Sequence, residues 1–179
     1  MYRESESYTK GKLKTKFYED RLVEAKQQSA RLEAMRKVVK AEDMPWEKCR
    51  EGKIKHVCNE DMDARVTSFD AYIQEIPAGG RTGKHRHMRE EAFYVLEGKG
   101  YDIHHDPDLH LKKTYEWGIQ KEGKKFQWEE GDLVYIPVMV AHQHFNADPE
   151  KPARIIVANP RIPIYMGCEL WEQLEDAPE

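Results

Sequence analysis

The N-terminal part of the chain has the pattern of a polar helix. Residues 15–40 are rich in Glu, Lys, Arg, Gln, Ala and Leu and contain no Gly or Pro, which predicts one helix from about Thr15 to Lys40. Its apolar residues form only a thin stripe, so the helix cannot build much of a core by itself. We expect it to lie across the main domain or against a second subunit, or to stand as a solvated appendage.

The pattern changes after a linker in which Pro45 breaks the helical periodicity. From Lys53 onward, short runs rich in Val, Ile, Tyr and Phe alternate with Gly, Pro, Asn and Asp, as in strands joined by turns. The predicted strands are 54–58, 67–76, 92–97, 100–105, 114–120, 126–128, 133–136, 142–146 and 154–160. The segment QKEGKKF (120–126) resembles a hairpin turn inside an insertion.

This spacing of short strands predicts a mainly β protein, a sandwich or a barrel, with an N-terminal α-helical extension. We expect the helical extension and linker to cover residues 1–52, the barrel 53–165 and a C-terminal tail 166–179.

Composition narrows the function classes. The chain has 179 residues and a net charge of −4, with no basic surface expected for nucleic acid. No apolar run approaches the ~20 residues that span a bilayer, and the first residues lack the apolar segment of a secretory signal. The three cysteines form no CxxC pair, which favours a reducing compartment. We therefore predict a cytoplasmic protein with no nucleic-acid or membrane partner.

Candidate chemistry begins in the stretch GGRTGKHRHMREEAFYVLEGKG (79–100). In an extended strand, side chains two residues apart point the same way, so His85 and His87 share one face and Glu91 can return to it. Two imidazoles and a carboxylate on one side indicate three metal ligands. The alternative is a solvated polar turn before a hydrophobic strand.

A second histidine pair follows in GDLVYIPVMVAHQHFNAD (131–148). His142 is placed to supply a third imidazole opposite the first pair. His144 would share its face and act as a substrate contact or catalytic proton carrier, or simply as a hydrogen-bonded wall residue.

At these residues the chain resembles the cupin family. The first cupin motif, G(X)5HXH(X)3–4E(X)6G, matches at Gly79, His85, His87, Glu91 and Gly98. The second, G(X)5PXG(X)2H(X)3N, matches at Gly131, Pro137, His142 and Asn146. Met139 replaces the usual glycine, so the turn before His142 is expected to be shaped differently. The resemblance covers about Thr67 to Pro160.

The resemblance implies a jelly-roll β-barrel that holds a metal on His85, His87, Glu91 and His142. Such a ligand set suits a divalent ion, with Fe(II) first and Mn(II), Ni(II) or Zn(II) as alternatives. Four protein ligands leave a six-coordinate ion two open positions for a bidentate substrate, or for substrate and dioxygen.

The HRH…E and PVMVAHQHFN layout is also similar, more loosely, to cupin ring-cleaving dioxygenases of the gentisate type. This resemblance implies a non-haem Fe(II) dioxygenase that acts on a small phenolic or carboxylate-bearing aromatic molecule, with dioxygen as co-substrate and His144 as the proton carrier. Two alternatives stay open. One is an oxygen-independent metal-dependent lyase, isomerase or decarboxylase, and the other is a non-catalytic small-ligand-binding cupin. A homodimer is expected for a cupin of this size.

Four arginines, Arg81, Arg86, Arg154 and Arg161, could each offer a bidentate clamp to a substrate carboxylate. Arg86 lies between the two histidines and should point to the opposite face, so Arg154 and Arg161 are the better candidates. Phe93 is expected in the barrel interior because it shares the strand parity of Glu91. The segment HHDPDLHLKK (104–113) is expected to form a solvated loop, and the insertion between the motifs has room for an added hairpin.

Overall fold

The structure is a computed structural model that describes residues 16–64, 66, 68–111 and 115–178. Thr15, Thr67 and Thr114, which begin three of the predicted elements, lie outside these residues. The described chain divides into two units, one that ends at Met35 and one that begins at Arg36.

The first unit contains the predicted helix, α1 (Phe17–Ala34), and none of its residues is buried. The helix is shorter than the predicted 15–40, because Met35 takes an extended conformation that ends it. The next residue belongs to the second unit, where the backbone N–H of Arg36 donates to the carbonyl of Asp63 and its guanidinium donates to that of Met62 at 2.7 Å. These long-range hydrogen bonds take the place of the helical ones that the local sequence favours.

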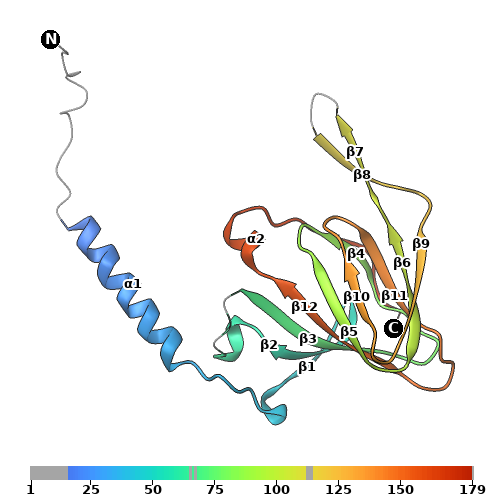
Figure 1. Ribbon diagram of the computed structural model, residues 1–179, viewed down its shortest axis with the longest axis horizontal. Helices are drawn as coiled ribbons and strands as arrows, with labels where there is room; N and C mark the ends of the chain where they lie inside the picture. Colours follow the sequence, from blue (N-terminus) through green and yellow to red (C-terminus); the bar gives the residue numbers. More distant parts are fainter. Residues whose placement is uncertain (1–15, 65, 67, 112–114, 179) are drawn as a thin grey trace. The chain divides into compact units, whose positions relative to one another are not determined.

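The second unit is mainly β, as predicted, and its strands form two antiparallel sheets (Figure 1). The first sheet has the order β1 (Trp46–Cys49), β2 (Gly52–Cys58), β3 (Phe69–Ile76), β12 (Ala153–Pro160), β5 (Glu91–Glu97) and β10 (Leu133–Ile136). The second has the order β13 (Trp171–Glu175), β4 (Lys84–His87), β11 (Ala141–Asn146), β6 (Lys99–His105) and β9 (Lys124–Glu129). Single helical turns lie at η1 (Ala41–Asp43), η2 (Glu60–Met62) and α2 (Ile162–Tyr165).

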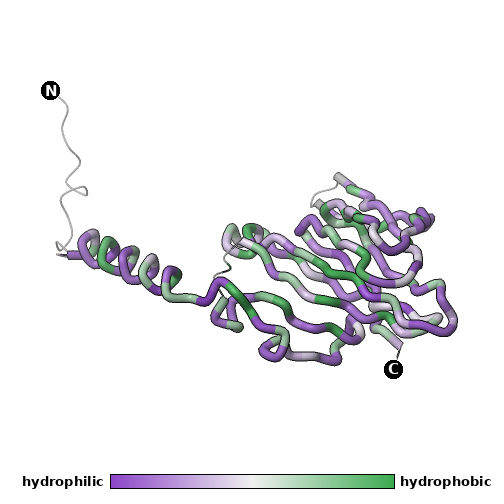
Figure 2. The backbone as a smooth tube through the Cα atoms, turned by 60° about the horizontal axis from the view of Figure 1, so that its bottom comes forward, coloured by the Kyte–Doolittle hydropathy of each residue, from purple (hydrophilic) through white to green (hydrophobic). Residues whose placement is uncertain are grey.

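Alternating side chains of the two sheets form a common core. On β12, Ile155 and Val157 are fully buried and Ile156 between them is not, which is the period-two pattern of a sheet with one face against a core. Phe93 of β5 belongs to the same core and meets Trp128 of β9, in the other sheet, edge-on at 6.1 Å. Hydrophobic residues recur along the strands, as Figure 2 shows. The predicted interior position of Phe93 is confirmed.

The insertion between the two motifs forms the expected hairpin, β7 (Pro107–Leu111) paired with β8 (Tyr115–Ile119), which projects beyond β6 and β9 (Figure 1). Two expectations for this region were wrong. Residues 107–111 form a strand instead of a solvated loop, because they pair with β8. Residues 120–126 are not a hairpin turn, because β8 and β9 pair with β7 and β6 and not with each other.

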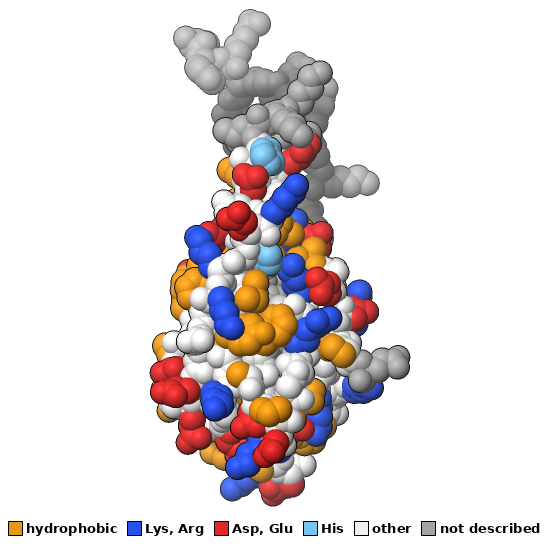
Figure 3. All heavy atoms as spheres, turned by 90° about the vertical axis from the view of Figure 1, so that its right-hand side faces the viewer, with side chains coloured by type: hydrophobic (Ala, Val, Ile, Leu, Met, Phe, Trp, Pro, Cys, Tyr) orange, Lys and Arg blue, Asp and Glu red, His pale blue; other side chains and the backbone are white. Residues whose placement is uncertain are grey.

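The surface carries charges of both signs, as the composition predicts, with hydrophobic side chains grouped near the centre of the face seen in Figure 3. Among the described residues, no helix has the length and apolar character needed to cross a membrane.

Candidate metal centre

Three strands bring four of the predicted residues together. Strand β4 carries His85 and His87, β5 begins with Glu91, and β11 carries His142, which pairs in register with His85. One ligand atom from each side chain lies within 4.8 Å of all the others. All four side chains are buried, at 1% exposure or less. The HxH and Glu spacing, which predicted side chains on one face of a strand, therefore corresponds to one buried cluster in the structure.

Contacts on the far side of each imidazole leave one ring nitrogen free for an ion. Nδ1 of His87 lies 2.8 Å from the carbonyl of Arg89, and Nδ1 of His142 lies 2.9 Å from that of Val140, so both donate from Nδ1. Nδ1 of His85 lies 2.9 Å from Oε2 of Glu51, an ion-pair contact without good hydrogen-bond geometry. The three Nε2 lone pairs therefore face the centre of the cluster.

The facing atoms have no hydrogen-bond partner. These atoms are Nε2 of His85, His87 and His142 and both carboxylate oxygens of Glu91. Buried polar atoms without partners cost ~1–3 kcal/mol each. Three neutral nitrogens and a carboxylate are a suitable donor set for a borderline divalent ion, so the residues fit the metal that a cupin site implies.

Electrostatics keeps the cluster in the state that binds a cation. Burial would raise the pKa of Glu91, but the adjacent His87 and His142 outweigh it and hold that pKa well below its usual range. Burial, together with neighbouring His85, lowers the pKa of His142 well below that of free histidine. A charged carboxylate and a neutral imidazole are the forms that coordinate metal.

His144 lies beside this cluster and not within it. Its Nε2 is 3.7 Å from Oε1 of Glu91, and its Nδ1 is 2.9 Å from Oδ1 of Asp102. Burial opposes a charged imidazole, but Asp102 raises the pKa of His144 to about 9. The free Nε2 is therefore directed toward the metal centre by a carboxylate on the opposite side of the ring.

Asp102 was not identified from the sequence. Its carboxylate is fully buried and also receives the indole N–H of Trp128 at 2.8 Å and lies 3.2 Å from Nε2 of His104. Burial raises the pKa of Asp102, but these donors and His144 bring it down to about 2. No spacing rule links a residue on β6 to a histidine on β11, so only the strand pairing could reveal it.

Trp171 covers the cluster from the C-terminal strand β13. Its ring stacks on those of His85 and His87, with centroids 4.8 Å and 5.0 Å apart. It reaches them because β13 pairs with β4 and places Trp171 opposite His87. Its position was predicted to lie in the C-terminal tail, because a single tryptophan far from both motifs gives no indication that it contacts a metal ligand.

A cavity of about 290 Å³ opens beside Trp171. Its walls include the apolar Ile54 and Ala71, the polar Tyr72 and Asn159, and charged residues such as Arg89. Trp171 borders both the cavity and the histidines, so this cavity adjoins the metal centre through the indole. Arg161 stands at its edge but already contacts Asp70 and Glu60 at 2.7 Å and 2.6 Å.

Of the other three candidate arginines, Arg81 lines the larger cavity described next, and two are engaged by protein carboxylates. Arg154 contacts Glu75 and Glu97. Arg86 contacts Glu172 at 2.6 Å, and it lies on the opposite face of β4 from the histidines, as expected. None of Arg86, Arg154 and Arg161 has a carboxylate-free guanidinium to offer a substrate.

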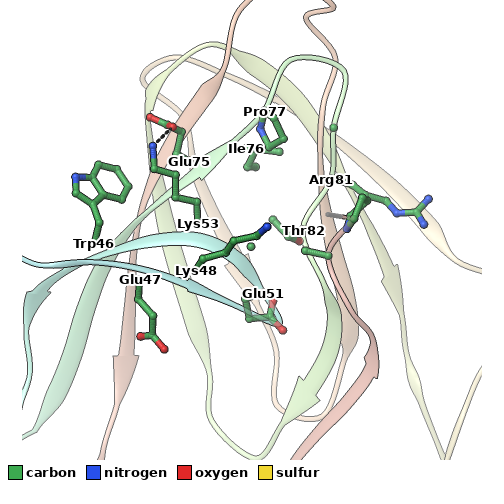
Figure 4. Close-up of a pocket in the computed structure, with 14 residues that line it drawn as sticks. Trp46, Glu47, Lys48, Glu51, Lys53, Glu75, Ile76, Pro77, Arg81 and Thr82 are labelled. Atoms are coloured by element: carbon green, nitrogen blue, oxygen red, sulfur yellow. Dashed lines mark hydrogen bonds and ion pairs between the residues drawn. The ribbon is translucent and has the colours of Figure 1, made fainter.

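A larger cavity of about 550 Å³ lies behind Glu51 (Figure 4). It is lined by Trp46, Pro77 and Thr82, and the Lys53–Glu75 ion pair closes one side at 2.7 Å. Two of its lining residues reach the metal centre. Glu51 contacts the outward nitrogen of His85, and the hydroxyl oxygen of Thr82 accepts a hydrogen bond from the backbone N–H of His144.

Met139, the departure from the second motif, keeps the backbone shape of a glycine. Its φ is 63°, in the left-handed region that disfavours side chains with a Cβ. The side chain is fully buried, and the backbone N–H donates to the carbonyl of His87 at 2.9 Å. The expectation of a differently shaped turn is not supported, since burial of the methionine stabilises the strained conformation.

Comparisons with known proteins identify the family. A family model described as auxin binding protein matches residues 27–174. The auxin-binding protein T85 of Nicotiana tabacum is 27% identical over 99 residues, which cover 55% of this chain and 49% of that protein. The chain thus spans about half the length of the curated relatives it matches.

Solved structures of cupins resemble the fold. The polyketide cyclase RemF of Streptomyces resistomycificus has a TM-score of 0.52 at 20% identity, and the match covers 78% of this chain and 86% of that one. The oxalate decarboxylase of Lactobacillus farciminis has a TM-score of 0.52 at 17% identity, covering 77% and 34%. At these identities the likeness extends to the jelly-roll fold alone.

Proposed function

Since this chain belongs to the auxin-binding protein family, which is of the cupin type, we propose that it binds a small carboxylate-bearing aromatic molecule at a divalent metal held by His85, His87, Glu91 and His142. The observation that carries the proposal is the set of buried, unpartnered nitrogen and oxygen atoms that converge at the centre of the cluster. A ligand carboxylate and a divalent cation complement each other in charge.

The ion we place first is Fe(II), with Mn(II), Ni(II) or Zn(II) as alternatives for the same ligand set. When bound, the ion supplies Lewis-acid chemistry toward the ligand's oxygens and, as Fe(II), electrons for reaction with dioxygen. The protein contributes a dry, rigid set of donors, in which each imidazole is held by a contact on its outward nitrogen.

The ligand occupies the cavity beside Trp171 in this proposal. Ile54 and the indole of Trp171 offer apolar contacts to an aromatic ring. Both arginines that line the cavity are paired with protein carboxylates, Arg161 with Asp70 and Glu60 and Arg89 with Glu169. The carboxylate of the ligand is therefore anchored by the metal and not by a guanidinium.

We further propose that the protein is an enzyme, a non-haem dioxygenase of aromatic acids, in which His144 carries a proton at its Nε2. The supporting observation is the Asp102–His144 pair beside Glu91, because an imidazole oriented by a buried carboxylate is an arrangement used for proton transfer. Asp102 is a positioning residue, since it contacts His144 and not the ligand space. An oxygen-independent lyase, isomerase or decarboxylase would use the same pair.

A second candidate, a non-catalytic small-ligand-binding protein, is favoured by the names of the family and of its tobacco members, which refer to auxin binding alone. It predicts tight binding of aromatic carboxylates to the metal-loaded protein without turnover. Homodimer formation and a cytoplasmic location stay predictions.

Metal analysis of protein purified without added metal, followed by dioxygen-uptake measurements with a panel of phenolic acids, tests these proposals. Stoichiometric iron and substrate-dependent uptake, lost in His144→Ala at unchanged iron content, would support the dioxygenase. Bound zinc, nickel or manganese with ligand conversion but no uptake would support the lyase group. Ligand binding without conversion, whichever metal is bound, would support the non-catalytic binding protein. Protein that takes up no divalent metal would refute the proposal as a whole.

A further inference from the structure

Asn159 is a polar residue of the cavity that the mechanism above does not use. It lies on β12, is 3% exposed, and its side-chain oxygen Oδ1 is buried without a hydrogen-bond partner. More than nine in ten buried polar groups have a partner, and a carbonyl oxygen left without one costs ~1–3 kcal/mol. The cavity therefore contains an acceptor that lacks a donor.

The sheet register places Asn159 next to a metal ligand. Val157 pairs with Phe93 and Ala158 with Ala92, so the next position brings Asn159 opposite Glu91 on the neighbouring antiparallel strand. Val157 and Phe93 both point into the core, and side chains two residues along point the same way. Cβ atoms of such neighbours are ~4.5–5.5 Å apart, so the amide of Asn159 lies beside the carboxylate of Glu91 on the inner face.

Tyr72 lies next to this amide. It belongs to the adjacent strand β3 and packs against the core; burial raises the pKa of its hydroxyl, and the nearby side chain of Asn159 opposes that rise. Both residues line the cavity beside Trp171. The Oδ1 of Asn159, which has no donor in the protein, is left for a ligand.

From these positions we infer that Asn159 is a specificity residue, which accepts a hydrogen bond from a hydroxyl group next to the ligand's metal-bound carboxylate and so selects 2-hydroxy acids over the corresponding simple acids. The inference rests on the proposed metal-anchored carboxylate, because that anchor fixes the part of the ligand that reaches Asn159. A donor on the atom adjacent to the carboxylate is within reach of a residue that neighbours Glu91. Groups farther along the ligand would meet Trp171 and Ile54 instead.

Three acids that share one phenyl ring test the inference: phenylacetate, mandelate and O-methylmandelate. O-methylmandelate keeps the oxygen of mandelate but not its proton, so it separates hydrogen-bond donation from coordination by that oxygen. Calorimetric titration of the metal-loaded protein should give mandelate at least ~10-fold tighter binding than either of the other two, because both leave the acceptor unpaired.

Two variants assign the effect to the residues. Asn159→Leu, of similar volume, should bring the three affinities to within about threefold of one another, the residual expected when no buried acceptor discriminates among them. Tyr72→Phe should weaken the preference for mandelate without abolishing it, because it removes a polar neighbour of the amide and keeps the amide itself. Metal content equal to that of the parent shows that a variant retains its fold and its metal centre.

The outcomes distinguish the role of Asn159 from the metal-anchored carboxylate on which it rests. Equal affinities of mandelate and O-methylmandelate in the parent protein would overturn the role of Asn159 and leave the metal-anchored carboxylate standing. A preference that survives unchanged in Asn159→Leu at parental metal content would also overturn it. Failure of all three acids to bind the metal-loaded parent would overturn both this inference and the proposed carboxylate ligand.

Discussion

Replacement of Met139 tests whether the turn before His142 stores backbone strain. A residue with a Cβ in the left-handed conformation costs ~1–2 kcal/mol relative to the right-handed one, and Met139 has φ 63°. Its side chain is fully buried, so truncation to alanine should cost ~2–5 kcal/mol. Met139→Ala loses this packing and keeps the strain, whereas Met139→Gly loses the packing and relieves the strain.

The two variants should therefore rank in an unusual order. Glycine gives back ~1–2 kcal/mol of strain and loses ~0.5–1 kcal/mol to its greater freedom in the unfolded chain. Met139→Gly should be more stable than Met139→Ala by ~0.5–1 kcal/mol, although both are less stable than the parent. Urea unfolding of the metal-free proteins, monitored by tryptophan fluorescence, measures the difference.

The neighbouring Val140 supplies a matched control. It is also buried, at 3% exposure, but its φ is not positive. Here alanine should be more stable than glycine by ~0.5–1 kcal/mol, the usual order. If Met139→Ala proved as stable as Met139→Gly or more so, the left-handed conformation would not be a source of strain, and the argument that burial stabilises this turn would be refuted.

The remaining predictions concern the metal and the buried pair beside it. His142→Ala should lose most of the bound metal in elemental analysis, because it removes one of four donors, whereas His144→Ala should keep it; an empty site in His144→Ala would show that the ligands are wrongly assigned. Chelation of the metal should lower the unfolding midpoint. The free energy of unfolding should fall by ~2.7 kcal/mol if free metal stood at 100 times its Kd. Equal midpoints with and without chelator would argue against a metal site in the folded state. In the metal-free protein, the pKa of His144 is raised to about 9 in the folded state, so its contribution to stability is complete below its unfolded pKa of ~6.5 and is lost as the pH rises through 9. Asp102→Asn should flatten this decline in urea midpoints between pH 6.5 and 9.5, and an unchanged slope would exclude the pair as its cause.

The strands near the two motifs could be predicted because their signals are local. Alternation of apolar and polar residues identified β5, β10 and β12 to within a residue or two, since one face of each strand lies against the core. The HxH and Glu spacing likewise placed His85, His87 and Glu91 on one face, because that needs only the geometry of a single strand. His142 and His144 followed from the second motif in the same way, although a ligand role for the first and a proton role for the second stay predictions.

Several features depended on contacts between distant segments, and local patterns were a poor guide to them. The helix ends at Ala34 because Arg36 forms hydrogen bonds to Met62 and Asp63, and no helix propensity encodes that contact. Strand β13 was treated as part of a tail, yet its pairing with β4 brings Trp171 onto the histidines. Where the domain boundaries lie stays a prediction.

By itself, the sequence determined the mainly β class, the polar helix before it and the donor types available for a metal. Each of these follows from composition and from spacing within one element. The tertiary structure alone decided that Asp102 stands behind His144, that Glu51 contacts His85 and that Trp171 stacks on His85. Those juxtapositions join residues more than 30 positions apart, and their partners are set by strand register and burial, which only the assembled sheets specify.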